Sequence, residues 1–255
     1  MQLNYILHPS TILLIFANLL TIFIALAQNW DVFVLMILYV VQGLIIGGFH
    51  YLKTLNLKDF SARDFSKNFS LRLYAGRRAF SPPNIESLGK KDAKRKVANY
   101  FLAGYLLFHL VYIFFIFLII IFGPSLTFQL NLGNSWQNNW DGLHSSGPGQ
   151  GILVEKVLSE IMGFGFICAI IGFFIIHLVS YLIFRREQNG RVNLGKFVNE
   201  PFNRIYPIHI IIIISMPVLV LLKNPAVLLV IFLLLKTLLD VGLHIKQHSN
   251  YLSVD

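Results

Sequence analysis

Residues 10–27 read STILLIFANLLTIFIALA, eighteen positions without a charged side chain. A helix of about 20 mostly apolar residues crosses the hydrocarbon core of a bilayer. The whole chain has a similar character, because 56% of its 255 residues are hydrophobic and 23 are Phe. Only 13% of the residues are charged, about half the share found in soluble domains. The stretch therefore predicts a membrane-spanning helix in an integral membrane protein.

Five further segments come near the same length and polarity. The fourth segment exceeds one span, and the charges in its first part, ILVEKVLSE, indicate an interfacial turn before a core span that begins near residue 163. The predicted fold is all-α, a polytopic integral membrane protein that forms a single transmembrane domain over residues 1–255. Its six predicted helices cover residues 10–27, 31–52, 98–123, 153–184, 205–222 and 225–243.

The basic residues predict the orientation of these helices. Eighteen of the 21 Lys and Arg residues fall in 53–97, in 185–204 and in the C-terminal tail. Because cytoplasmic loops of membrane proteins are rich in Lys and Arg, these segments are predicted to be cytoplasmic, as are both termini. The polar loop 124–152 then lies outside. The three Trp residues fall on that outer side, where indole rings favour the headgroup layer.

Charge also bears on the expected partners. A net charge of +9 and a pI near 9.7 would suit a nucleic-acid-binding protein. The basic residues stand between apolar blocks, however, so we expect the lipid bilayer and its anionic headgroups as partners, and no nucleic acid. The sequence leaves open whether the protein forms a homo-oligomer. The basic loop 53–97 is either a partly ordered linker or carries one amphipathic helix on the membrane surface.

Two smaller features concern processing and redox state. ALAQ at residues 25–28 resembles a signal-peptidase site, but no Lys or Arg precedes the apolar stretch, so we expect this helix to be retained. Cys168 is the single cysteine, which excludes an intrachain disulfide. The expected location is the cell membrane.

Residues 233–248, LLLKTLLDVGLHIKQH, place three ionisable side chains in the last predicted helix. An ionisable group at the centre of a bilayer costs about 2.5–3.5 kcal/mol on insertion scales. Lys236, Asp240 and His244 are four residues apart and so lie on one helical face. We therefore predict that Asp240 pairs with Lys236 near mid-membrane and orients His244 near the cytoplasmic edge.

Other predicted helices also carry polar side chains, and most of these lie in the cytoplasmic half of the membrane. If their faces converge, they line a polar pocket that opens to the cytoplasm. Each also has a structural interpretation, as a hydrogen bond that packs helices, a snorkelling anchor or an ion pair that fixes helix register. Asn18, an amide within the first helix, is expected to serve packing. The candidate site residues are Gln42, His50, His109, Arg204, His209, Lys236, Asp240 and His244.

A metal or haem site is disfavoured. Asp240 and His244 could ligate one ion together with His209 or His50, but the motif H-E-x-x-H is absent. The neighbouring Lys236 would also oppose cation binding. No metal ligand is assigned, and the cofactors stay unknown.

Three stretches resemble a known family: LYVVQGLIIGGFHYLKTL at 38–55, EPFNRIYPIHIIII at 200–213, and LLLKTLLDVGLHIKQH at 233–248. In this order they resemble the multi-pass membrane proteins of bacteria and archaea grouped as domain of unknown function 6498. The resemblance implies a prokaryotic source but no activity. It makes the following residues signature positions: Lys53, Arg204, His209, Lys236, Asp240 and His244.

The chain departs from that family pattern in two places. Gln42 stands where the signature has a carboxylate, and residues 101–103 replace a His-Tyr-Gly. If the family's site needs that acid and that histidine, this member is altered or inactive.

Three functions remain open. The leading hypothesis is binding or transport of a small solute, proton or anion through the cytoplasm-facing pocket. The first alternative is an intramembrane metal-dependent enzyme that uses His209, Asp240 and His244. The second is a non-catalytic membrane assembly subunit, in which the charges only hold helices together.

Overall fold

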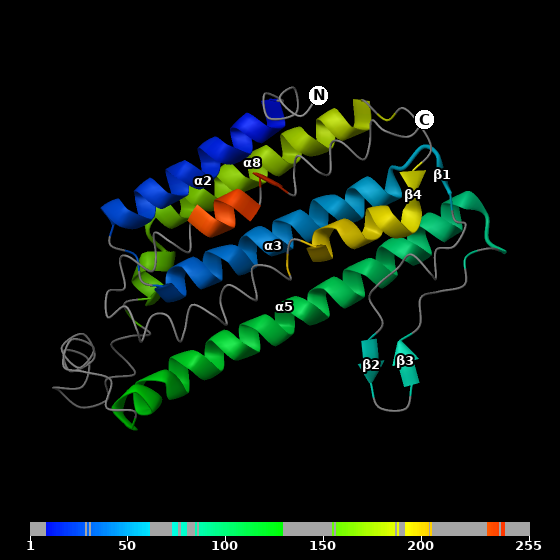
Figure 1. Ribbon diagram of the computed structural model, residues 1–255. Helices are drawn as coiled ribbons and strands as arrows, with labels where there is room; N and C mark the ends of the chain where they lie inside the picture. Colours follow the sequence, from blue (N-terminus) through cyan, green and yellow to red (C-terminus); the bar gives the residue numbers. More distant parts are fainter. Residues whose placement is uncertain are drawn as a thin grey trace.

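The computed structural model is mostly helical, and the residues that it describes form four long helices (Figure 1). They are α2 (Pro9–Ala27), α3 (Val32–Leu55), α5 (Lys90–Gln129) and α8 (Phe164–Arg186). The structure describes residues 9–28, 30, 32–61, 73–75, 78–80, 85, 87–129, 155, 157–186, 188, 192–203, 205, 234–239 and 241–242.

Three helices in the described residues are long and apolar enough to cross a membrane. These spans are Val34–Leu55, Lys90–Phe114 and Phe164–Arg186, and a shorter apolar helix covers Ile15–Ala27 in α2. The length of each matches the roughly 20 residues that a bilayer requires. The predicted fifth and sixth helices lie mostly outside the described residues.

Helix α5 begins at Lys90, earlier than the predicted start at residue 98. The segment KKDAKRK carries good helix formers, and Asp92 lies in the first turn, where a negative charge favours the helix dipole. Ala93 and Val97 are buried, so this basic turn also packs one face onto the core. The Lys and Arg count alone had placed the segment in a loop.

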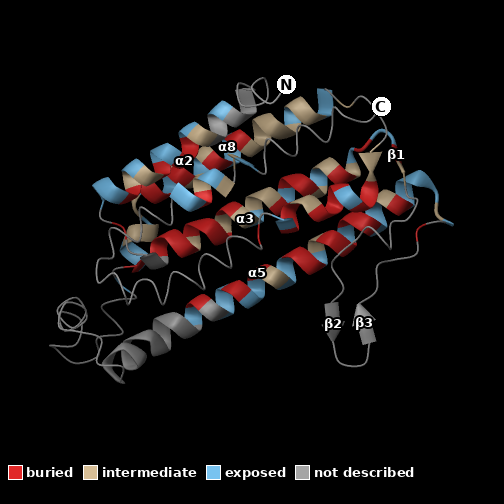
Figure 2. Cartoon of the chain, viewed as in Figure 1, coloured by how far each residue is buried: buried red, intermediate tan, exposed pale blue. Residues whose placement is uncertain are grey.

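Helix α3 occupies the middle of the arrangement. It packs against α8 on one side and against α5 on the other, and α2 packs against α8. The buried residues follow the faces where helices meet, and the opposite faces are exposed (Figure 2). One apolar cluster joins α2, α3, α5 and α8, and a second joins the chain just after α3, the first half of α5, and residues 194–203 with Ile205.

Residues 194–203, part of the segment predicted to be cytoplasmic, form a buried helix that was not predicted from the sequence. Leu194, Phe197, Val198 and Phe202 follow a helical spacing, and each is almost fully buried. This helix packs against α3 and α5, so the second cluster continues past the ends of the long helices.

Two short strand pairs also lie in the predicted basic segments. β1 (Phe60–Ser61) pairs in parallel with β4 (Val192–Asn193), and β2 (Leu73–Ala75) pairs antiparallel with β3 (Arg78–Phe80). The first pair fastens the chain after α3 to the chain after α8.

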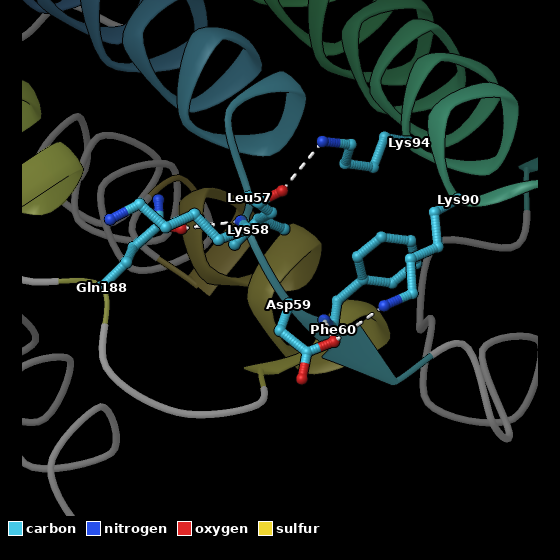
Figure 3. A network of polar contacts seen from close by, with 7 residues as sticks. All are labelled: Leu57, Lys58, Asp59, Phe60, Lys90, Lys94 and Gln188. Carbon is cyan, nitrogen blue, oxygen red and sulfur yellow. Dashed lines mark hydrogen bonds and ion pairs between the residues drawn. The ribbon is translucent and has the colours of Figure 1, made fainter.

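The ends of α3 and α8 and the start of α5 meet at what we call the basic end. Here Lys94 Nζ donates to the Leu57 carbonyl at 2.8 Å, and Lys90 forms an ion pair with Asp59 at 3.3 Å (Figure 3). The backbone N–H of Lys58 donates to Gln188 Oε1 at 2.8 Å. These contacts hold three helix ends together.

Candidate functional site

Lys236 is buried where several helices meet, with only 2% of its surface exposed. Its Nζ donates to Asn18 Oδ1 of α2 at 3.0 Å and to Gln42 Oε1 of α3 at 2.8 Å. The same ammonium lies 4.8 Å from the ring centroid of Tyr39 and 5.3 Å from that of Phe173. We call Asn18, Tyr39, Gln42 and Phe173 the lysine cage.

The cage lies midway along the helices that build it. Asn18 is at the centre of α2, nine residues from either end. Gln42 is thirteen residues before the end of α3, about 20 Å along the helix axis. Tyr39 and Gln42 are three residues apart and therefore share a face of α3. The cage therefore lies near the middle of α2 and α3, and the predicted depth of Lys236 in a membrane stays a prediction.

The electrostatics of the cage suit a cation. Amide oxygens are hydrogen-bond acceptors, and the faces of aromatic rings carry the negative part of their quadrupole. All four cage residues thus present electronegative groups to Nζ. A hydrogen bond to a charged group contributes about 1.5–3 kcal/mol, so two such bonds offset much of the cost of placing the charge there.

The structure brings only some of the predicted site residues together. Gln42 and Lys236 meet, and Asn18, expected to serve helix packing, joins them. His50 and His109 lie instead between α3 and α5. His50 stacks on Phe197 with ring centroids 4.5 Å apart, and His109 Nδ1 is 2.9 Å from the Tyr105 carbonyl oxygen.

The other four predicted site residues, Arg204, His209, Asp240 and His244, lie outside the described residues. The Lys236–Asp240 pair therefore stays a prediction. Within the part of the chain that the structure describes, no group of three His, Cys, Asp or Glu side chains could hold a metal ion.

The sequence profile of one family, the family of unknown function DUF6498, matches residues 3–254. The chain belongs to this family. The resemblance drawn from three stretches of sequence is thereby confirmed. Neither a curated protein nor a solved structure matches this DUF6498 member, so its activity must be argued from the lysine cage.

A close contact between α3 and α5 accounts for the placement of His109. The Tyr105 hydroxyl of this DUF6498 protein donates to the Gly43 carbonyl at 2.9 Å. A Cβ atom at Gly43 would overlap His109 Nε2, and one at Gly47 would overlap the Tyr105 ring. The two glycines form a G-x-x-x-G motif, GLIIG, which lets helices approach closely in membranes. This motif is present in the sequence and could have predicted the contact.

Sequence reasoning also missed the aromatic half of the cage. Tyr39 had a usable signal, because it lies one turn before Gln42 on the same face. Phe173 had none, because it is one of many Phe residues in an apolar helix.

Proposed function

We propose that this protein is a multi-pass membrane protein of the prokaryotic cell membrane that binds and moves a proton or small solute. Its six helices place both termini and the basic end in the cytoplasm, by the distribution of Lys and Arg. Lys236 is the group that takes up and releases the proton. The observation that carries the proposal is the buried Lys236 ammonium inside the lysine cage.

A lysine at this depth is expensive compared with any apolar side chain. The insertion cost is about 2.5–3.5 kcal/mol for a charged residue at the centre of a bilayer. A Leu or Met at position 236 would pack without that cost. Ionisable residues within spanning helices commonly mark proton relays or substrate pathways, and this supports a functional role for the cage.

The neutral partners of Lys236 suit a group that changes its protonation state. The amide oxygens of Asn18 and Gln42 accept a hydrogen bond from an ammonium, and equally from a neutral amine. The rings of Tyr39 and Phe173 pack against either form. The cage can therefore keep its geometry while a proton leaves or returns.

The same chemistry favours a proton, carried by Lys236 itself, over an anion. Oxygen lone pairs and ring faces surround Nζ, and both repel negative charge. Of the ligands considered from the sequence, an anion is the one that this cage supports least.

Proton flux into liposomes tests the proposal. The purified protein is reconstituted with the pH dye pyranine inside, and a K⁺ gradient with valinomycin drives protons inward. We expect acidification that depends on the protein and is lost in Lys236→Met and in Lys236→Arg. Arginine keeps the charge and can donate to Asn18 and Gln42, but it does not release a proton in proteins.

The Arg variant separates the proposal from a structural role. If Lys236 only clasps helices, a folded Lys236→Arg protein retains the wild-type flux, and the proposal fails. Absence of flux in the folded wild type also overturns it. Thermal unfolding of each variant in detergent is the control that tells whether the variant is folded.

A further inference from the structure

The interface between α3 and α8 continues from the lysine cage to the basic end. Beyond Phe173, the ring of Phe49 stacks on His177 with centroids 6.4 Å apart and also contacts Tyr181. Lys53 Nζ then donates to Ser180 Oγ at 3.1 Å. One turn on, Asn56 Nδ2 donates to the Tyr181 hydroxyl at 3.0 Å.

The spacing along α8 makes this row continuous with the cage. Phe173, His177 and Tyr181 are four residues apart, so they lie on one face of the helix. Each step of four advances about 6 Å along the axis. Phe173 packs on the Lys236 ammonium, and the contact between Asn56 and Tyr181 is exposed. The row therefore runs from the buried lysine to the solvent-exposed end of the bundle.

The side chains in this row can carry a proton. Imidazole accepts a proton on one ring nitrogen and releases one from the other, and hydroxyl groups both donate and accept. His177, Ser180 and Tyr181 are partly buried along α8, where an apolar interface would need none of them. The titratable groups among the described residues of this row are Lys53, His177, Tyr181 and Lys236, with Tyr39 in the cage.

His109, one of the two histidines between α3 and α5, has a different setting. His109 Nδ1 lies 2.9 Å from the carbonyl oxygen of Tyr105, and the Tyr105 hydroxyl donates to the carbonyl of Gly43. Both side chains are thus held on backbone carbonyls in a tight helix contact. That interface serves as an internal comparison for the α3–α8 interface.

We infer that the α3–α8 interface is the proton route between Lys236 and the basic end, with His177 as the intermediate proton-binding residue. This inference rests on the proposed function and adds a path to it. Phe173, which packs on the Lys236 ammonium, precedes His177 by about one helical turn on α8, so the proposed transfer between Lys236 and His177 passes through bridging water. Ser180, Tyr181 and Lys53 complete the path to solvent.

Accessibility of single cysteines tests the route without reference to flux. The only native cysteine is first replaced, as Cys168→Ser, and His177→Cys and Ser180→Cys are made in that background. The probe is a small, membrane-impermeant cationic thiosulfonate applied to inside-out vesicles. We expect both cysteines to react.

Ala98→Cys on α5 is the matched control. Lys94 of α5 contacts Leu57, and Phe101 of α5 contacts His50 of α3. Ala98 lies between these two positions of α5 and is therefore level with Lys53 of α3. Lys53 in turn contacts Ser180 of α8. Ala98 is fully buried in the α3–α5 interface. We expect the two α8 cysteines to react at least about tenfold faster than the control, because apolar burial suppresses the reactive thiolate. Equal rates at all three positions overturn the route.

Flux measurements then test the role of His177. We expect His177→Phe and Tyr181→Phe to lower the proton flux, and Tyr112→Phe, which removes a buried hydroxyl on α5, to leave it unchanged. If wild-type flux is present and His177→Phe retains it, the route is wrong and the proposed function stands. If the wild type has no flux, the proposed function fails, and cysteine labelling alone decides whether the interface gives water access toward Lys236.

Discussion

Lys236 donates to Gln42 across 194 residues of sequence, with 2.8 Å between Nζ and Oε1. The same ammonium reaches Asn18 of α2 and lies on the ring of Phe173 of α8. One side chain therefore connects the helical segment 234–239 to three long helices. Helix packing and the proposed proton binding depend on the same atom, so stability and flux must be measured together.

The Lys236–Gln42 contact predicts an energetic coupling between the two positions. Gln42→Leu leaves the buried ammonium with one acceptor fewer, which costs about 1–3 kcal/mol. Lys236→Met removes the charge that this acceptor stabilises. The loss of Gln42 therefore costs less stability in the Lys236→Met background. We expect the double variant to be more stable than the sum of the single effects by about 0.5–3 kcal/mol.

Thermal unfolding of the four proteins in one detergent measures this coupling. Additive effects within about 0.5 kcal/mol would show that the two residues do not stabilise each other. A double variant as stable as the wild type would assign the pair to helix packing, and the flux assay would then decide whether any other role remains.

Gln42→Glu is predicted to raise the melting temperature. The ammonium already makes the hydrogen bond at 2.8 Å charge-assisted, and a carboxylate in place of the amide adds an opposite charge on the acceptor. It also compensates a buried positive charge. Each 1 kcal/mol gained shifts the melting temperature of a chain of this size by about 2–4 °C.

Differential scanning fluorimetry at neutral pH measures this shift, with Gln42→Leu as the control expected to move the other way. A lower melting temperature in Gln42→Glu would mean that Lys236 is a neutral amine in the folded protein. In that case the new carboxylate would be buried without a counter-charge, a costly arrangement.

The contact between α3 and α5 predicts different outcomes for three glycines of one helix. A methyl group at Gly43 would overlap the His109 ring, and one at Gly47 would overlap the Tyr105 ring. Inserting a methyl group into a packed core costs about 1–3 kcal/mol. A methyl at Gly48 meets no atom within 4 Å, so Gly48→Ala is expected to be neutral or slightly stabilising.

Melting temperatures of the three Ala variants test this packing. The matched Gly48 variant controls for the helix propensity that all three changes share. Equal melting temperatures for Gly43→Ala and Gly48→Ala would contradict the close approach of α3 and α5.

The sequence predicted that Lys236 lies inside the helical body, where it is buried, but it did not give the cross-helix partners. Counting residues along a helix gives depth and same-helix neighbours such as Asp240. Asn18 is 218 residues away from Lys236, and nothing in the spacing says which helices meet. A correct choice needed the packing of α3 between α8 and α5, and a single sequence does not encode that packing in any local pattern.

The helix at residues 194–203 shows a second limit. Counting Lys and Arg places a segment on one side of the membrane but does not say that it lacks structure. Leu194, Phe197, Val198 and Phe202 carry a helical period that predicts a buried face. The charge count was given priority over this period, and for that reason the helix was missed.

The last prediction concerns Lys94 at the basic end. Its Nζ donates at 2.8 Å to the carbonyl of Leu57, just beyond the end of α3, where backbone acceptors lack helical partners (Figure 3). Lys94→Ala should therefore cost about 1 kcal/mol. Lys91→Ala removes an equal charge from an exposed position of the same turn, and a surface change of this kind stays within about 0.5 kcal/mol.

Amide hydrogen exchange near residues 55–58 distinguishes the hydrogen bond from a general effect of charge. We expect faster exchange in Lys94→Ala and no change in Lys91→Ala, because only Lys94 fixes the chain that leaves α3. Lys94→Met keeps the apolar stem but not the donor, so it should behave like the Ala variant. If Lys94→Met instead matches the wild type, packing of the stem holds this end of α3, and the hydrogen bond contributes little.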